Sequence, residues 1–422
     1  MHRKMFTVST VLVAVLAAQQ VIEAPAGLDT PTLADNPGSQ STSNGIIEPP
    51  GDTFALDQTQ FERKHDPSQA GSGLGPVYNA TACAECHQNV VTGAASQITE
   101  LRAGHRDASG NFVNPTILIN GGKNTIAGRS IVNDRATCEQ AVEHLPATEN
   151  IRALRAVLST LGDGFVEAVD DNTLLGIAQN QPARSRGQIH GEAIHVPILE
   201  APGQTRVGRF GWKDQQPTVL SFAADAYLNE MGVTSRLRPT DTTPVCKTTS
   251  DPEDVPDSLG LANIDHFAQF IRGSKAPPRD PDLASTPDAQ LGHDLFKATG
   301  CATCHVETLI TARAGTLING GQYRVPEALG GKIIHPFGDY LLHDVGTGDG
   351  IVQAGPQDTA NKLRTAPLWG LHVKSRFMHD LVSLTLEDAI ERHGGEAQGV
   401  IARYNTLTAA EKAQLVTFLK SL

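Results

Sequence analysis

The clearest pattern of apolar and polar positions predicts a helix that begins near residue 286. Thr286 has the character of an N-cap, Pro287 suits the first helical turn, and Asp288 favours the positive end of the helix dipole. The apolar stripe that follows consists of Leu291, Leu295 and Phe296. We expect this helix to run up to Cys301 and to bury that stripe.

Two further capping sequences predict helices near the C-terminus. Thr408 with Glu411 precedes one apolar face, which consists of Leu415, Phe418, Leu419 and Leu422. Thr385 with Asp388 begins another helix, which we expect to run to about His393 and to end at the glycines that follow. On this second helix the inward face consists of Leu386, Ile390 and His393.

The N-terminal half has weaker periodicity. Ordered structure is expected to start near residues 54–61. Apolar residues recur at helical spacing in four ranges that we predict to be helices: 151–158, 169–178, 216–231 and 264–272. Clusters of glycine and proline between them predict long loops and turns. Together these elements predict a mostly α, loop-rich fold.

Composition suggests where the chain divides. Residues 276–281 contain three prolines and predict a stiff linker, which separates an N-terminal domain (54–280) from a C-terminal domain (281–422). Residues 25–53 are rich in proline, serine and glycine and predict a flexible N-terminal segment.

Residues 1–24 have the pattern of a signal peptide. A basic start, His2-Arg3-Lys4, precedes an apolar run from Phe6 to Ala18 that is too short to span a bilayer comfortably. We therefore expect a periplasmic protein without a membrane span in the mature chain. The net charge of −12 argues against nucleic acid as a partner.

Two copies of one motif carry the candidate chemistry. The chain reads Cys-x-x-Cys-His at 83–87 and again at 301–305, which is the attachment signature of a c-type haem. Two thiols bind the haem vinyl groups, and the adjacent histidine becomes an iron ligand. We therefore predict two covalently attached haems, bound by Cys83, Cys86, His87, Cys301, Cys304 and His305, in two cytochrome-c-like domains packed against each other.

The second axial ligand of each iron decides what the haem does. Two protein ligands make an electron carrier, whereas one ligand leaves the iron open to a small oxidant. His393 is the best candidate at the second haem. At the first haem, His105 is either a ligand or a surface histidine, and the site is otherwise open.

Three further residues suit redox chemistry. Glu167 and Glu230 lie in apolar surroundings, where a carboxylate is either structurally paired or available for proton transfer. Trp212 is either plain core or an electron relay between the haems. The two remaining cysteines, Cys138 and Cys246, either form a disulfide, as is common in an oxidising compartment, or stay free.

Several segments resemble the bacterial di-haem oxidoreductases, a family also described as peroxidases or thiol oxidoreductases. They are 209–213, 229–232, 339–344, 363–371, 378–380 and 385–396. This family is similar to the di-haem cytochrome c peroxidases and to the enzyme that matures tryptophan tryptophylquinone. Phe222 stands where the peroxidases keep a glutamine, and Leu381 replaces a usual glycine.

The resemblance implies roles for individual residues. Glu230 matches the catalytic glutamate, Trp212 matches the bridging tryptophan, and His393 matches the sixth ligand of the second haem. It also implies an interdomain calcium ion, a small cytochrome or cupredoxin as electron donor, and peroxide as oxidant. We therefore expect a peroxidase-like oxidoreductase. The alternatives are an electron-transfer cytochrome without substrate, or an enzyme that oxidises a partner protein at long range.

Overall fold

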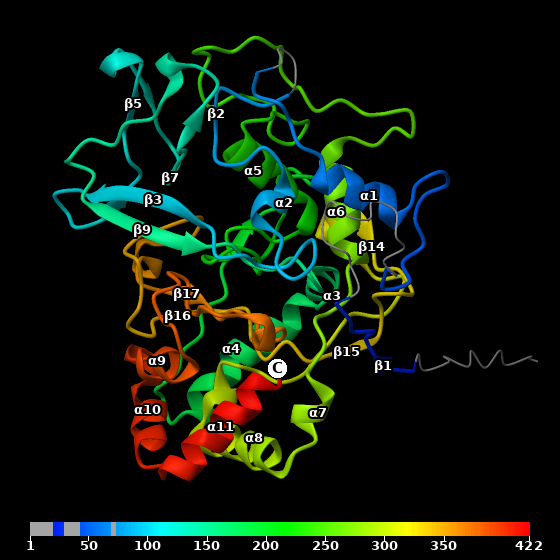
Figure 1. Cartoon of the computed structure of the whole chain (residues 1–422), viewed down its shortest axis with the longest axis vertical. Coiled ribbons are helices and arrows are strands. Elements are labelled where there is room, and N and C mark those ends of the chain that lie inside the picture. Colours follow the sequence, from blue (N-terminus) through cyan, green and yellow to red (C-terminus); the bar gives the residue numbers. More distant parts are fainter. Residues whose placement is uncertain (1–19, 29–42, 69–72) are drawn as a thin grey trace, which may run out of the picture.

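The computed structural model describes residues 20–28, 43–68 and 73–422. Most of the predicted signal peptide and much of the predicted flexible segment lie outside these residues. Figure 1 shows helices α8–α11 gathered at one end of the molecule and a group of strands, including β3 and β9, at the other. Helices α1, α5 and α6 lie beside the strands.

The helices are α1 (Phe54–Glu62), α2 (Cys83–Cys86), α3 (Asp163–Glu167), α4 (Asp171–Arg184), α5 (Val219–Met231), α6 (Asn263–Gly273), α7 (Pro281–Ala284), α8 (Pro287–Thr299), α9 (Leu386–Glu391), α10 (Gln398–Asn405) and α11 (Ala409–Lys420).

The strands are β1 (Ile22–Glu23), β2 (Val77–Tyr78), β3 (Thr99–Arg106), β4 (Phe112–Val113), β5 (Ile117–Ile119), β6 (Asn124–Ile126), β7 (Ile131–Val132), β8 (Arg135–Ala136), β9 (Ile151–Ala156), β10 (His195–Pro197), β11 (Thr205–Val207), β12 (Leu309–Ile310), β13 (Leu317–Ile318), β14 (Tyr323–Arg324), β15 (Lys332–Ile334), β16 (Leu342–His343) and β17 (Leu363–Arg364).

The prediction of a mostly α fold is wrong. Helices account for 31% of the structure and strands for 16%, spread over several small sheets. Most of these strands are two or three residues long. A strand that short shows no readable alternation of apolar and polar residues, so the sequence pattern favoured loops there.

The largest sheet corrects one predicted helix. Range 151–158 contains strand β9, which pairs antiparallel with β3 over six residues; β4 and β7 also pair with β3. Leu154, expected on a buried helical face, is 51% exposed. In so short a range the apolar spacing fits a helix or a strand, and pairing with β3 makes this range a strand.

The C-terminal helices follow the sequence closely. Thr286 caps α8 with Pro287 in its first turn, and Thr408 and Glu411 form the predicted capping box of α11. Helix α11 packs on α8, and Phe296, Leu415 and Phe418 share one core with its neighbours, although Leu291 is 49% exposed. A side chain at Gly292 would place its Cβ 2.0 Å from a carbonyl of α11, so this glycine permits the close approach.

Two links tie distant parts of the chain together. Cys138 and Cys246 form a disulfide across 108 residues, with their Cα atoms 6.4 Å apart. Strand β1, inside the range predicted as signal peptide, pairs parallel with β15 of the C-terminal half. In the described part of the chain, no helix is long and apolar enough to cross a membrane.

Glu167 holds together α3, α5 and α6. Its carboxylate accepts two hydrogen bonds from Arg272, at 2.6 and 2.9 Å, and one each from Asn319 and the backbone of Val219. Burial opposes the charge, but Arg272 and the hydrogen bonds lower the pKa of Glu167 below its ordinary value. Glu167 is therefore a structural group, one of the two readings that its sequence left open.

We expect Glu167→Gln to lower the free energy of unfolding by about 3–5 kcal/mol, because it leaves the buried Arg272 without its charge partner. The difference in free energy of unfolding between wild type and variant should shrink as the pH falls below about 4.3. In that range the glutamate of the unfolded chain takes up a proton before the native one does, which favours unfolding of the wild type. Chemical denaturation of both proteins at pH 7 and pH 3 measures this. An equal difference at both pH values would contradict it.

Candidate functional site

The first Cys-x-x-Cys-His motif opens onto a cavity of about 570 Å³. Helix α2 carries both thiols, and α5 together with β3 and β9 supplies other parts of the wall. Burial raises the pKa of the Cys83 and Cys86 thiols to about 12. Burial also lowers the pKa of His87 to about 4, so its imidazole is neutral and able to bind a metal.

Among the carboxyl groups in the wall of this first cavity, Glu230 and Glu100 interact with each other. Glu230 on α5 accepts a hydrogen bond from Asn79 at 2.8 Å, and Glu100 on β3 is paired with Arg102 through contacts of 2.6 and 2.9 Å. Burial, and then the charge of Glu100, raises the pKa of Glu230 to about 8. Burial opposes the ionisation of Glu100, but Arg102 lowers the pKa of Glu100 below its ordinary value.

The consequence is a buried acid pair that holds one proton at neutral pH. Glu230 keeps the proton, and Glu100 stays ionised beside Arg102. The sequence pointed to Glu230 alone. Glu100 and Arg102 lie on a strand whose sequence gave no sign that it reaches this cavity.

Two other candidates from the sequence lie elsewhere. His105, at the end of β3, contacts Glu149 through Nδ1 at 2.7 Å and is not among the residues that line the first cavity. Within the described lining of that cavity, His87 is the one imidazole. Glu167 lines neither cavity.

The second motif opens onto a separate cavity of about 250 Å³. His305 and His393 face each other in it, with ring centroids 6.4 Å apart. Nδ1 of His305 is bonded to the Phe337 carbonyl at 3.0 Å, and Nδ1 of His393 to the Ala389 carbonyl at 2.7 Å. These bonds assign the ring protons to Nδ1 and leave each Nε2 with a free lone pair.

The spacing of these two rings fits one metal atom between them. Two metal–imidazole bonds account for about 4 Å, and the two ring radii account for the rest. Burial lowers the pKa of His305 to about 4 and also lowers the pKa of His393, so both rings are neutral. Helix α9 ends at Glu391, before His393, yet the bond to Ala389 keeps this histidine on the inward face as the helical pattern predicted.

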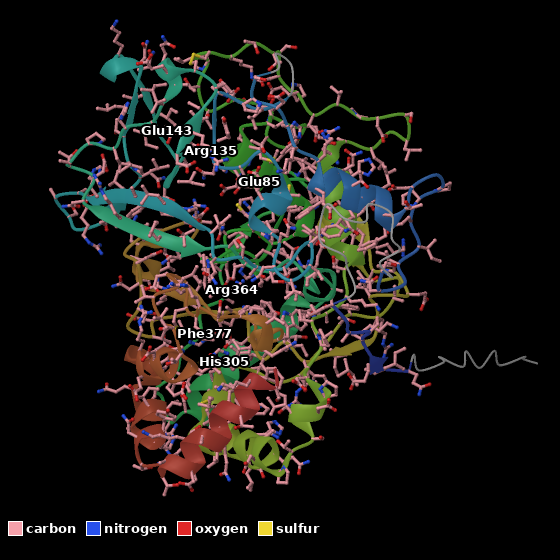
Figure 2. The ribbon with its side chains drawn as sticks, viewed as in Figure 1. Glu85, Arg135, Glu143, His305, Arg364 and Phe377 are labelled. Carbon is pink, nitrogen blue, oxygen red and sulfur yellow. A yellow bond between two sulfur atoms is a disulfide. The ribbon has the colours of Figure 1, made fainter. Side chains whose placement is uncertain are left out.

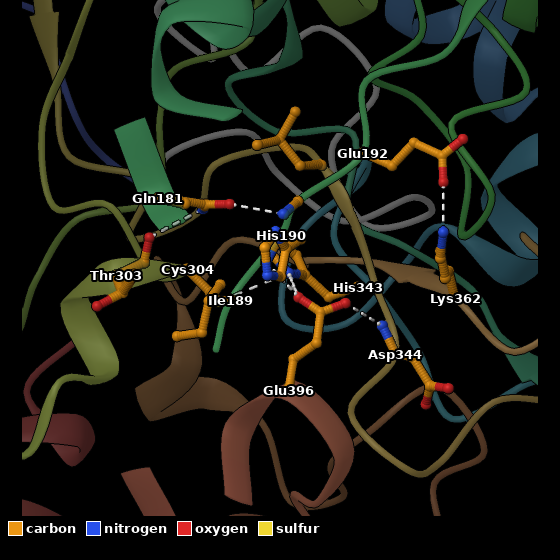
Figure 3. A network of polar contacts seen from close by, with 12 residues as sticks. Gln181, Ile189, His190, Glu192, Thr303, Cys304, His343, Asp344, Lys362 and Glu396 are labelled. Carbon is orange, nitrogen blue, oxygen red and sulfur yellow. Dashed lines mark hydrogen bonds and ion pairs between the residues drawn. The ribbon is translucent and has the colours of Figure 1, made fainter. Parts of the chain in front are cut away.

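A network of polar contacts surrounds Thr303 and Cys304 of the second motif (Figure 3). His343 contacts Asp339 through Nε2 and Glu396 through Nδ1, each at 3.0 Å, and lies 3.8 Å from the Cys304 sulfur. Burial disfavours its charge, but Asp339 raises the pKa of His343 well above its ordinary value. Gln181 donates to the Thr303 carbonyl at 3.0 Å and fixes the motif from α4.

Basic side chains also reach the second cavity. Arg364, Phe377 and His305, which Figure 2 labels, line the second cavity. The other residues labelled there, Glu85, Arg135 and Glu143, line the first cavity. Burial, and then the charge of Arg364, lowers the pKa of Lys374 to about 8. Such cations suit the two carboxylates of a haem.

Trp212 lies between the two cavities. It lines both of them, together with residues 156–158. Its indole donates a hydrogen bond to the Ala156 carbonyl at 2.8 Å, and its ring meets that of His379 edge to face at 6.0 Å. The structure therefore places Trp212 where the sequence expected a bridge.

Three solved structures are only distantly similar to this chain. A MauG-like protein associated with microbial copper homeostasis is 25% identical over 38% of this chain, with a TM-score of 0.25; the chain spans about half (52%) of that protein. The diheme peroxidase BthA from Burkholderia thailandensis E264 is 14% identical over 94% of this chain and 95% of its own, with a TM-score of 0.33. Hydrazine synthase from Kuenenia stuttgartiensis is 14% identical over 99% of this chain and 100% of its own, with a TM-score of 0.34.

The comparison with curated proteins found no match. The family model described as "Di-haem oxidoreductase, putative peroxidase" matches residues 133–422, well over half of the chain. That range includes the second haem motif, Trp212, Glu230 and His393. The protein belongs to this family of di-haem oxidoreductases.

Proposed function

We propose that this protein is a periplasmic di-haem peroxidase that reduces peroxide at the first haem and receives electrons through the second. The observation that carries the proposal is the difference between the two cavities. Two neutral imidazoles face each other in the second, whereas His87 shares the first with a carboxyl pair. The second site would give an iron two protein ligands, whereas the first would leave one ligand position of the iron free for peroxide.

Both cavities fit a covalently attached haem. Cys83 and Cys86 supply two partly buried free thiols beside a neutral His87, and Cys301 and Cys304 do the same beside His305. Lys374 and Arg364 provide charges for the haem carboxylates at the second site. When bound, the haems would supply the two electrons that peroxide reduction consumes.

The acid pair of Glu230 and Glu100 would carry out the proton transfer. Reduction of hydrogen peroxide takes up two electrons and two protons and gives two molecules of water. Glu230, protonated at neutral pH, donates a proton to the leaving oxygen and takes up the next one. Glu100 is a positioning residue, because its charge keeps that proton on Glu230, and Arg102 holds Glu100 ionised.

The remaining residues concern electron supply and location. Trp212, in the wall of both cavities, offers an aromatic route between them. Two imidazole ligands give the second haem a lower potential than a histidine–methionine pair would, which suits a donor site. The electron donor would be a small cytochrome or cupredoxin. The leader-like sequence and the Cys138–Cys246 disulfide favour an oxidising compartment such as the periplasm.

We expect Glu230→Gln to lower kcat/KM for hydrogen peroxide by about 10²–10⁴-fold, because the variant lacks the proton-transfer group. In the wild type, kcat/KM should fall as the pH rises through about 8, where Glu230 loses its proton. The variant should lack this alkaline limb. Steady-state kinetics from pH 6 to pH 10 measure both effects.

Asp265→Asn is the control, since Asp265 pairs with Arg236 at 2.7 Å and is not among the residues that line the first cavity. Its kinetics should resemble the wild type. Unchanged turnover in Glu230→Gln, with unchanged haem spectra, would remove Glu230 from the mechanism. A protein without peroxidase turnover in any form would instead be an electron-transfer cytochrome.

Glu100→Gln tests the partner of Glu230. Removing the charge of Glu100 lowers the pKa of Glu230, so the alkaline limb of kcat/KM should move to lower pH. Glu100→Asp keeps the charge and should leave the limb near its wild-type position. If both variants lose activity without moving the limb, Glu100 has only a structural role.

A further inference from the structure

Three buried side chains meet on the far side of α1 and α6, away from the haem cavities. Asp52 lies in the loop before α1, Asp57 lies on α1, and His266 lies on α6. They are 7%, 0% and 2% exposed. One ligand atom from each lies within 4.8 Å of the other two. None of them has a part in the proposed peroxidase reaction.

His266 joins the two carboxylates. Its Nδ1 lies 2.7 Å from Oδ1 of Asp57 and 3.8 Å from Oδ1 of Asp52. Its Nε2 faces Oδ2 of Asp257 at 3.3 Å. Without a metal, Nδ1 and Oδ1 of Asp57 share a hydrogen bond. With the Nε2–H donating to Asp257, Nδ1 would offer its lone pair to a metal bound by the two aspartates. This is the arrangement of a metal-binding histidine supported by an outer carboxylate.

The cluster has more negative charge than the protein neutralises. Among residues 20–28, 43–68 and 73–422, the one ion-pair partner of Asp52 and Asp57 is His266. Oδ2 of Asp57 is buried without a hydrogen-bond partner, and so is Oε1 of the neighbouring Glu48.

Two other buried carboxylates in this protein have strong cationic partners. Glu167 is paired with Arg272, and Asp349 with Arg155 at 2.6 Å and with Lys213 at 3.1 Å. Buried carboxylates without such partners are costly, and a bound cation removes that cost. The unpartnered oxygen of Asp57 therefore points to a ligand that the protein itself does not supply.

We propose that Asp52, Asp57 and His266 bind a structural zinc ion. One imidazole with two carboxylates is a donor set for a first-row divalent metal rather than for calcium, which takes oxygen ligands. The low exposure of all three residues matches a closed structural site rather than a catalytic one.

The surroundings complete the site. Gln269 donates to Oδ2 of Asp52 at 2.9 Å, and the backbone amide of Thr53 donates to Oδ1 at 2.9 Å, so this carboxylate is held in place. A polar pocket of about 700 Å³ is lined by His266 and Asp257, so solvent reaches the cluster from the side of the outer carboxylate. Oriented ligands and an entry path are what a metal site requires.

The zinc ion would fasten α1 to α6. Phe61, on the inner side of α1, lies against the His87 ring at 6.0 Å and the Phe267 ring at 6.1 Å. Phe267 follows His266 on α6, and both phenylalanines line the first cavity. Zinc at this position would therefore stabilise the wall behind the proximal histidine of the first haem.

The test uses the haem-loaded protein, dialysed against EDTA and then titrated with Zn²⁺ alone. We expect about one zinc per chain by elemental analysis, and a rise in Tm that saturates with zinc. Asp57→Asn should weaken zinc binding at least about tenfold. In the metal-free protein, Asp57→Asn should leave Tm unchanged or raise it, because it removes a carboxylate that its neighbours repel.

Asp265→Asn is the control. Asp265 lies on α6, as His266 does, but it pairs with Arg236 and not with the cluster. This variant should keep the full zinc response. Three results would overturn the proposal: no saturable zinc, zinc binding retained in Asp57→Asn, or a Tm response to Ca²⁺ but not to Zn²⁺. A metal-free Asp57→Asn protein less stable than the metal-free wild type would also overturn it, since the two aspartates would then share a proton.

Discussion

The structure depends on one shared wall. Trp212 and residues 156–158 form part of both cavities, and the hydrogen bond from the Trp212 indole to the Ala156 carbonyl fixes their relative position. The backbone amide of Arg364 donates to the Trp212 carbonyl at 2.8 Å and ties the same residue to the C-terminal half. In the proposed function, this wall would set the separation between the two haems that exchange electrons. The rest of the fold determines what each cavity contains.

Burial then gives the two cavities different chemistry. In the second cavity it keeps His305 and His393 neutral, so both can bind one metal. In the first it raises the pKa of Glu230, while Arg102 holds the neighbouring Glu100 ionised. In the proposed function, the same physical effect would therefore produce a closed site on one side of Trp212 and a proton-handling site on the other. Glu167, also buried, is excluded from such a role because Arg272 neutralises it.

The sequence predicted those features that depend on local pattern. Caps and apolar spacing located α8 and α11, and the inward face at 385–393 located His393. Features that depend on distant partners were missed or left open. Strand β9 forms because β3 lies beside it, and Glu100 reaches the cavity because that sheet turns it there. Likewise, the pairing of Cys138 with Cys246 depends on a distance in space that spacing in the sequence does not reveal.

The most direct test of the central claim is the EPR spectrum of the purified protein, fully oxidised and half-reduced, before and after hydrogen peroxide is added. The account predicts one high-spin haem that responds to peroxide and one low-spin haem, and it predicts that His393→Ala converts the low-spin signal to high spin. Two low-spin haems that peroxide leaves unchanged in both redox states would contradict it. The protein would then be an electron carrier in which the carboxyl pair beside His87 has no substrate.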